Sequence, residues 1–172
     1  MGHRGRIGRG SRGRVLALAS TAAAAVVLWA AGLAGAAPAN DAFSSATVVT
    51  GATGTWSGSN VGATRESGEP IDIAGGGTTI WYRWTAPSSG PATFDTFGSS
   101  FDTILSVYTG TSVKSLSLVA RNDDSTEWGP PTSRVTFTAT ANVTYRIQVD
   151  GRWGATGALT LTLNRPRPDN DA

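Results

Sequence analysis

The chain has 172 residues, no cysteine and one histidine, His3, and it carries a formal net charge of +2. This composition excludes thiol nucleophiles and disulfides, and it leaves no Cys/His zinc site. Stability must therefore come from a packed hydrophobic core or from a bound ion.

The start of the chain has the pattern of a secretory signal peptide. Five arginines make it basic: Arg4, Arg6, Arg9, Arg12 and Arg14. An apolar run from Val15 to Ala36 follows and ends in small residues. We predict a signal peptide over residues 1–36, with cleavage after Ala36 or as late as Ala39, and a secreted, extracellular bacterial protein. Because the apolar run exceeds the usual length of about 7 to 15 residues, an uncleaved membrane anchor is the alternative.

Removal of this leader changes the sign of the net charge. Five of the fourteen basic residues leave with it, so nine basic residues face twelve acidic ones and the mature chain has a net charge of −3. The isoelectric point of about 9.5 belongs to the precursor. A nucleic-acid partner, which requires a basic surface, is therefore not expected.

From Asn40 onward, short runs of period two recur between clusters of Gly, Pro, Asn and Asp. Apolar and polar residues alternate in 134–139, 145–150 and 159–164, so each of these strands can bury one face. Further strands are expected near Thr47, Trp56, Ile80, Phe94, Ile104 and Val119. We predict that residues 40–164 form an all-β, jelly-roll-like antiparallel β-sandwich of eight or nine strands, followed by a disordered tail over 165–172.

The strand expected over Thr79–Thr85 is the centre of this sandwich. Ile80, Tyr82 and Trp84 point to one side of it, which we expect to face the core, and Trp81 points to the other side. Two tryptophans on opposite faces can both be buried only if the strand is central in its sheet.

The loop before this strand is acidic and rich in glycine. Glu66, Glu69 and Asp72 precede the glycines at 75–77, which allow carboxylates and backbone carbonyls to lie close together. Calcium takes about six to eight such oxygen ligands, so the loop is a candidate cation site. As an alternative, its acids are solvated surface charges.

Six segments resemble the bacterial pre-peptidase C-terminal domain, in order and over nearly the whole mature chain: 40–51 (NDAFSSATVVTG), 58–70, 78–87 (TTIWYRWTAP), 99–110, 119–125 and 144–151. The resemblance implies a jelly-roll β-sandwich that is found as an appendage of secreted peptidases and other surface proteins. Some members, such as collagenase collagen-binding domains, bind calcium. The resemblance implies no catalysis.

In the calcium-binding members, the ligands come from an Asn-Asp pair at the domain start and from acids just before the aromatic strand. The resemblance therefore implies five calcium ligands: Asn40, Asp41, Glu66, Glu69 and Asp72. Where relatives have an Asp directly before the aromatic strand, this chain has Thr79, so Glu69 and Asp72 take its place. The other interpretation is that Asn40 and Asp41 cap the turn that follows them.

Further acids have a turn interpretation. We expect Asp102 to order a turn or to pair with an arginine, and the Asp-Gly pair at 150–151 to end a strand. Asp123 and Asp124 are expected in a turn, with a second ion, held together with Glu127, as the alternative.

We predict a secreted, non-catalytic accessory module, stabilised by calcium, that binds an extracellular protein or polysaccharide and has a secreted peptidase as a candidate companion. Trp128 and Trp153 are the candidate ligand-binding aromatics, unless they fold back over the core. One alternative is a small hydrolase that uses Glu66 and Glu69 as its paired carboxylates. The other is a structural spacer without a specific ligand. A membrane is a partner only if the leader is retained.

Overall fold

The computed structural model describes residues 1–2, 35–71, 74–125 and 131–165. The chain divides into two units, residues 1–32 and 33–172, and the fold below is that of the second unit. Most of the predicted signal peptide lies outside the described residues, as do Asp72, Glu127, Trp128 and the predicted tail after Arg165. Within the described ranges, no helix is long and apolar enough to cross a membrane.

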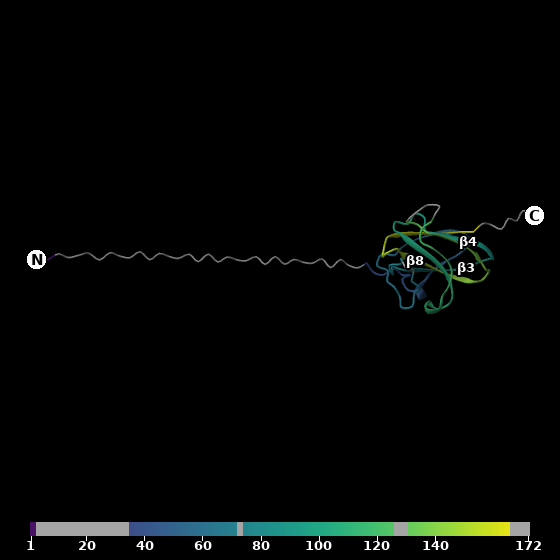
Figure 1. Ribbon diagram of the computed structural model, residues 1–172, viewed down its shortest axis with the longest axis horizontal. Helices are drawn as coiled ribbons and strands as arrows, with labels where there is room; N and C mark the ends of the chain where they lie inside the picture. Colours follow the sequence, from purple (N-terminus) through teal and green to yellow (C-terminus); the bar gives the residue numbers. More distant parts are fainter. Residues whose placement is uncertain (3–34, 72–73, 126–130, 166–172) are drawn as a thin grey trace, which may run out of the picture. The chain divides into compact units, whose positions relative to one another are not determined.

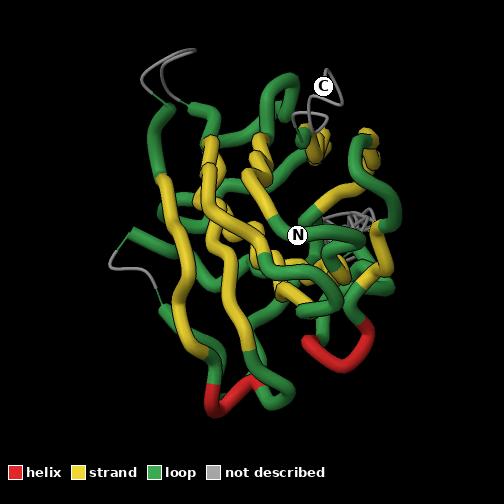
Figure 2. Tube along the Cα trace, turned by 90° about the vertical axis from the view of Figure 1, so that its right-hand side faces the viewer, coloured by secondary structure: helices red, strands yellow, loops and turns green. Residues whose placement is uncertain are grey.

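Nine strands and two short 3₁₀ helices form the described part of this unit (Figure 2). In chain order they are η1 (Phe43–Ser45), β1 (Thr47–Val49), β2 (Gly54–Ser59), β3 (Ile80–Thr85), β4 (Gly90–Asp95), β5 (Thr103–Thr109), η2 (Val113–Ser115), β6 (Ser117–Asn122), β7 (Arg134–Ala139), β8 (Thr144–Gly151) and β9 (Ala158–Asn164). Each strand coincides with a segment in which the sequence predicts one, so the all-β prediction is confirmed.

The strands form two sheets that pack face to face. One sheet has the order β1-β3-β8-β5-β6 and the other has the order β2-β9-β4-β7. β1 pairs with β3 in parallel, and the other described strand pairs are antiparallel. Without β1, the orders 3-8-5-6 and 2-9-4-7 are those of an eight-stranded jelly roll, so the predicted jelly-roll β-sandwich is confirmed. Figure 1 labels β3 and β8 in the first sheet and β4 in the second.

The hydrophobic core lies between the two sheets. Ile80, Tyr82 and Trp84 of β3 are buried in it, as their alternation predicted. The Trp84 ring meets Phe94 of β4 edge-on, with ring centres 5.7 Å apart, which is a favourable aromatic geometry. β9 adds a row of buried leucines from the other sheet. The alternation of apolar residues therefore predicts which face of each central strand meets the core.

A second, smaller hydrophobic cluster covers the outer face of the five-stranded sheet. Trp81 packs there with Phe43, Ala46 and Tyr108. The Phe43 ring meets the Trp81 ring edge-on at 5.2 Å. β3 lies between β1 and β8, so it is central in its sheet, and both of its tryptophans are fully buried. Both tryptophans of this strand are thus buried, and the strand is central in its sheet, as that burial requires.

The tail prediction is wrong for Arg165. This residue is 7% exposed, and its guanidinium donates to the carbonyl oxygens of Ser88 (3.0 Å) and Pro91 (3.1 Å) and to the Ser88 hydroxyl (3.1 Å). Its carbon Cζ also lies 5.5 Å from the centre of the Trp84 ring. The alternating Pro and charge after Arg165 gives no sign of these contacts, because the acceptors are distant in the chain: Ser88 lies between β3 and β4, and Pro91 lies in β4.

Candidate functional site

Asn40 and Asp41, the first two predicted calcium ligands, hold the start of the domain against the sandwich. Asn40 is buried, its side-chain amide donates to the carbonyl oxygen of Trp81 (3.1 Å), and its own carbonyl accepts from the Trp81 backbone N–H (2.9 Å). Asp41 accepts from the backbone N–H (2.6 Å) and the hydroxyl (2.8 Å) of Thr64. Both side chains therefore have partners within the protein.

Glu66 and Glu69, from the acidic loop, also accept hydrogen bonds from protein groups. Glu66 accepts from the backbone N–H of Phe43 (3.0 Å), the first residue of η1. Glu69 is only 3% exposed and accepts from the indole N–H of Trp81 (2.7 Å) and the hydroxyl of Thr79 (2.6 Å). Burial raises the pKa of the Glu69 carboxyl, and these two hydrogen bonds act in the opposite direction.

The structure thus brings the domain start and the acidic loop together, as a shared ion would require, but it does not gather their carboxylates closely. Among the described residues, three acids have oxygens that all lie within 4.8 Å of one another, and they are Asp102, Asp123 and Asp124. The described ligands of the predicted calcium site form no such group, and Asp72 lies outside the described residues. Calcium binding there stays a prediction.

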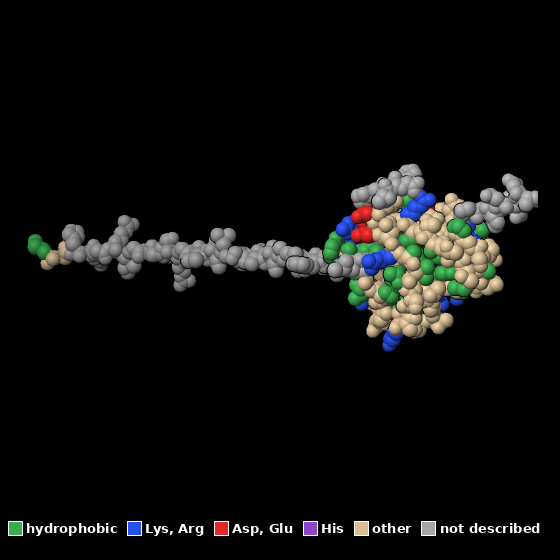
Figure 3. Space-filling view, turned by 45° about the vertical axis from the view of Figure 1, so that its right-hand side comes forward, with side chains coloured by type: hydrophobic (Ala, Val, Ile, Leu, Met, Phe, Trp, Pro, Cys, Tyr) green, Lys and Arg blue, Asp and Glu red, His purple; other side chains and the backbone are tan. Residues whose placement is uncertain are grey.

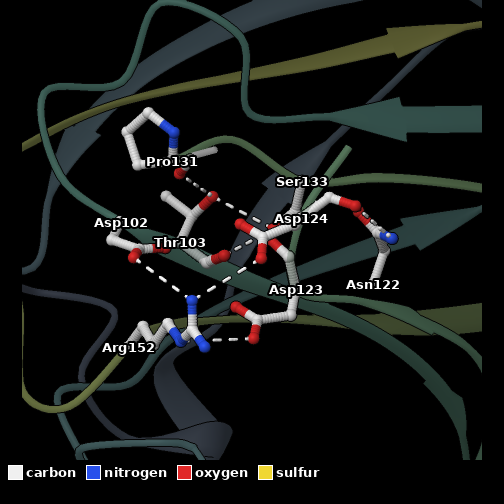
Figure 4. Close-up of polar contacts among 8 residues, drawn as sticks. All are labelled: Asp102, Thr103, Asn122, Asp123, Asp124, Pro131, Ser133 and Arg152. Carbon is white, nitrogen blue, oxygen red and sulfur yellow. Dashed lines mark hydrogen bonds and ion pairs between the residues drawn. The ribbon is translucent and has the colours of Figure 1, made fainter. Parts of the chain in front are cut away.

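The three aspartates surround one arginine at an end of the sandwich (Figure 4). The Arg152 guanidinium lies 3.8 Å from the Asp102 carboxylate, 3.4 Å from Asp123 and 3.5 Å from Asp124. Asp102 precedes β5, the other two acids follow β6, and Arg152 follows β8. We name these four residues the Arg152 cluster. The cluster confirms the expectation that Asp102 pairs with an arginine.

Buried polar groups fix the backbone beneath the Arg152 cluster. The Ser133 hydroxyl lies 2.6 Å from the carbonyl oxygen of Asp123. The Asn122 amide donates to the carbonyl oxygen of Asp124 (3.0 Å), and its oxygen accepts from the backbone N–H of Arg134 (2.9 Å). Asp123 and Asp124 therefore lie in an ordered bend that follows the end of β6 at Asn122. Partial burial raises the pKa of Asp102 in this cluster, Arg152 opposes the rise, and Asp124 adds to it.

Trp153 follows the Arg152 cluster directly, and its side chain is 73% exposed. Its backbone is tied down, because its N–H donates to the carbonyl oxygen of Ala74 (2.8 Å) and Gly76 packs against Gly154 too closely for a Cβ. Its φ of 51° lies in the left-handed region, which is uncommon for a bulky side chain. The alternative of Trp153 folding back over the core is therefore wrong. Trp128 lies outside the described residues.

Two buried polar residues hold this loop end together, and the sequence does not reveal their role. Asp150 and Gly151 are the last two residues of β8, so the pair ends a strand as expected, and the Asp150 carboxylate accepts from the backbone N–H of Thr78 (2.9 Å). Burial raises the pKa of Asp150, and its backbone hydrogen bonds oppose the rise. Asn60 donates to the carbonyl oxygen of Ala155 (3.0 Å) and accepts from the N–H of Gly157 (2.8 Å).

The rival hydrolase prediction requires Glu66 and Glu69 to face each other across an open cleft. Glu69 is instead enclosed beneath Trp81 and Thr79, so its carboxylate does not reach solvent as an acid or base would need to.

The surface in Figure 3 carries few charged side chains, and the acidic ones on that face gather at one place.

No family model and no curated protein matches the chain. The fold is similar to several solved structures. The pre-peptidase C-terminal domain of a Bacillus anthracis collagenase has 12% identity and a TM-score of 0.46, with 69% of this chain and 94% of that chain covered. The Aeromonas hydrophila periplasmic inhibitor of g-type lysozyme has 18% identity and a TM-score of 0.43 (69% and 95% covered). A surface-associated copper-binding protein of Methylomicrobium album has 10% identity and a TM-score of 0.41 (70% and 98% covered). These similarities concern the fold alone.

Proposed function

We propose that this domain is a secreted, non-catalytic module that binds an extracellular polysaccharide or protein through the loop end that carries Trp153. The observation that carries the proposal is the 73% exposed indole on a backbone held by hydrogen bonds and close glycine packing. A backbone that is already held in place loses little conformational freedom when a ligand covers the side chain that it carries.

The energetics of Trp153 favour a role in binding over a role in stability. An exposed indole contributes little burial to the fold, and a left-handed conformation costs a non-glycine residue about 1 to 2 kcal/mol. Tryptophan is also among the residues that most often dominate binding interfaces. A ligand that covers the indole would offset the cost that the free domain carries.

The Arg152 cluster supplies polar groups at the same loop end, since Arg152 directly precedes Trp153 in the chain. Its side chains are partly exposed, at 31% for Arg152 and 42% for Asp124. Carboxylates accept hydrogen bonds from hydroxyl or amide groups, and a guanidinium donates them. An apolar ring face beside such groups suits a sugar ring or a protein side chain with a polar edge.

The test is to present the secreted protein to an array of glycans and matrix proteins and to repeat the strongest interaction with two variants. Trp153→Ala is expected to weaken binding at least about tenfold. Leu118→Ala removes another exposed apolar side chain, on β6, and is expected to bind as the wild type does. Full binding by Trp153→Ala would overturn the proposed surface, and a protein that captures nothing would favour the spacer alternative.

Calcium binding is a second part of the proposal. It would join the segment of Asn40 and Asp41 to the loop of Glu66, Glu69 and Asp72, and these residues offer the oxygen ligands that calcium prefers. Each described carboxylate oxygen that accepts one hydrogen bond has a further lone pair. The described acids do not converge by themselves, so such an ion would depend on Asp72 and on backbone carbonyls.

A further inference from the structure

A groove of about 520 Å³ lies on the outer face of the five-stranded sheet, apart from the Trp153 loop end. β1, β3, β5 and β8 contribute to it, and its polar lining includes Arg83, Arg146, Thr85, Thr109 and Thr144. The volume is within the range of about 300 to 1,000 Å³ that is typical of small-ligand sites. We name it the arginine groove.

The two arginines of the groove are direct neighbours across two strands. Arg83 of β3 pairs in register with Arg146 of β8. Val48 continues the same row on β1, and Tyr108 continues it on β5. Like charges directly opposite each other in an antiparallel pair destabilise a sheet. An arginine pair at the middle of a sheet therefore has a cost that the fold itself does not require.

Neither arginine has a carboxylate partner among the described residues. The Nε–H of Arg146 is buried, and none of the residues that the structure describes accepts a hydrogen bond from it. Burial lowers the pKa of Arg146, and the charge of Arg83 lowers it further. Phe43 positions the Arg146 guanidinium, whose Cζ lies 4.5 Å from the ring centre. The Arg146 guanidinium is thus held in place, and no carboxylate of the described residues pairs with it.

We propose that the arginine groove binds the carboxylate of a hydroxylated acid, such as a uronic-acid unit of an extracellular polysaccharide. A guanidinium offers forked N–H groups that match the two oxygens of a carboxylate. The threonine hydroxyls beside the arginines donate and accept hydrogen bonds, as the hydroxyls of a sugar require. This site is independent of the proposed role of Trp153.

The position of the groove on the sheet argues against an extended peptide as its occupant. Peptides that add to a sheet need unpaired backbone groups at an edge. β3 is paired with β1 and β8, and β8 is paired with β3 and β5, so their backbone groups are already used. The edge strand β1 contributes only Val48 to the groove and is three residues long, which is short for an added strand to pair with. Recognition in the groove therefore depends on side chains, which suits a compact ligand with its own hydroxyl and carboxylate groups.

The experiment is a calorimetric titration of the secreted protein with trigalacturonate, with the neutral galactose trisaccharide as the control ligand. Wild-type protein is expected to bind the acid and not the neutral sugar, and binding should weaken as salt rises. Arg83→Gln and Arg146→Lys are each expected to weaken binding at least about tenfold, the second because lysine keeps the charge but lacks the fork. Arg121→Gln, the same charge change on β6, is expected to stay within about twofold, because Arg121 lies outside the groove.

Three outcomes would overturn the proposal: unchanged affinity in Arg83→Gln, equal affinity for inorganic phosphate, and equal affinity for oligoglutamate. Thermal melts without ligand provide a second measurement that also verifies folding. Because Arg83→Gln removes the like-charge pair, its melting temperature is expected to rise by about 1 to 4 °C. A fall would show that Arg83 stabilises the sheet, and it would remove the basis of the inference.

Discussion

The carboxylate of Glu69 accepts a hydrogen bond of 2.7 Å from the indole N–H of Trp81, in a place where both side chains are buried. This contact joins the acidic loop to the outer face of β3. It satisfies the one polar atom of an indole that is otherwise packed among apolar groups. The acid that the sequence places in an ion site thus has a structural partner within the protein.

Replacement of Glu69 by Gln is expected to change how stability depends on pH. Burial raises the folded-state pKa of Glu69 above its ordinary value of 4.5, so between these values the folded protein binds more protons than the unfolded one. The stability from this group is present below pH 4.5 and is lost as pH rises through the folded-state pKa. In urea titrations from pH 4 to pH 8, Glu69→Gln should therefore gain on the wild type as pH rises.

Glu69→Ala provides the contrast. It removes the same titrating group but leaves the Trp81 indole N–H and the Thr79 hydroxyl without this acceptor, so it should be about 1 to 3 kcal/mol less stable than Glu69→Gln at every pH. A constant difference between Glu69→Gln and the wild type across the pH range would contradict the shifted pKa.

A buried and an exposed tryptophan should respond differently to truncation. Trp84 is fully buried between the sheets, so Trp84→Ala is expected to cost about 3 to 5 kcal/mol in urea-induced unfolding. Trp153 is exposed with a φ of 51°, so Trp153→Gly is expected to leave stability unchanged or to raise it by up to about 1 kcal/mol. A loss above about 2 kcal/mol for Trp153→Gly would instead indicate a structural role for this indole.

The last described residue should mark the end of the folded domain. A chain that ends at Arg165 keeps the three hydrogen bonds of its guanidinium and is expected to be as stable as the full chain. A chain that ends at Asn164 leaves the carbonyl oxygens of Ser88 and Pro91 without these donors and should lose about 1 to 3 kcal/mol. Equal melting temperatures for the two truncated chains would contradict a stabilising role for Arg165.

Calcium is expected to raise the melting temperature of the secreted protein relative to excess chelator. An ion that binds only the folded state at 100 times its Kd adds about 2.7 kcal/mol to stability. Differential scanning calorimetry with millimolar calcium measures the shift, and the Asp41→Ala, Glu69→Ala double variant should lose it. Superimposable curves of the wild type with calcium and with chelator would rule out the predicted ion.

Export is expected to remove the basic leader. Intact-mass analysis of protein from the culture medium should give a chain that begins after Ala36, or as late as after Ala39. Recovery of the full chain in the membrane fraction would instead identify the leader as an anchor.

The sequence by itself determined the strands, the core-facing rows and the all-β class of this protein. These features depend on alternation between neighbours along one strand, which is local information. Ile80 and Trp84 face the core because they share a parity with Tyr82, and the apolar Trp81 at an outward position indicates that the other face of β3 is covered at that point.

Only the tertiary structure decided the polar partners. Glu69 meets Trp81, Asp150 meets Thr78, and Arg165 meets Ser88, which is 77 residues away in the chain. The register between β3 and β8 likewise sets Arg83 beside Arg146. Such pairs arise from strand order and register, which the packing of the whole core selects, so an isolated charged residue carries no local signal that tells a solvated side chain from a buried partner.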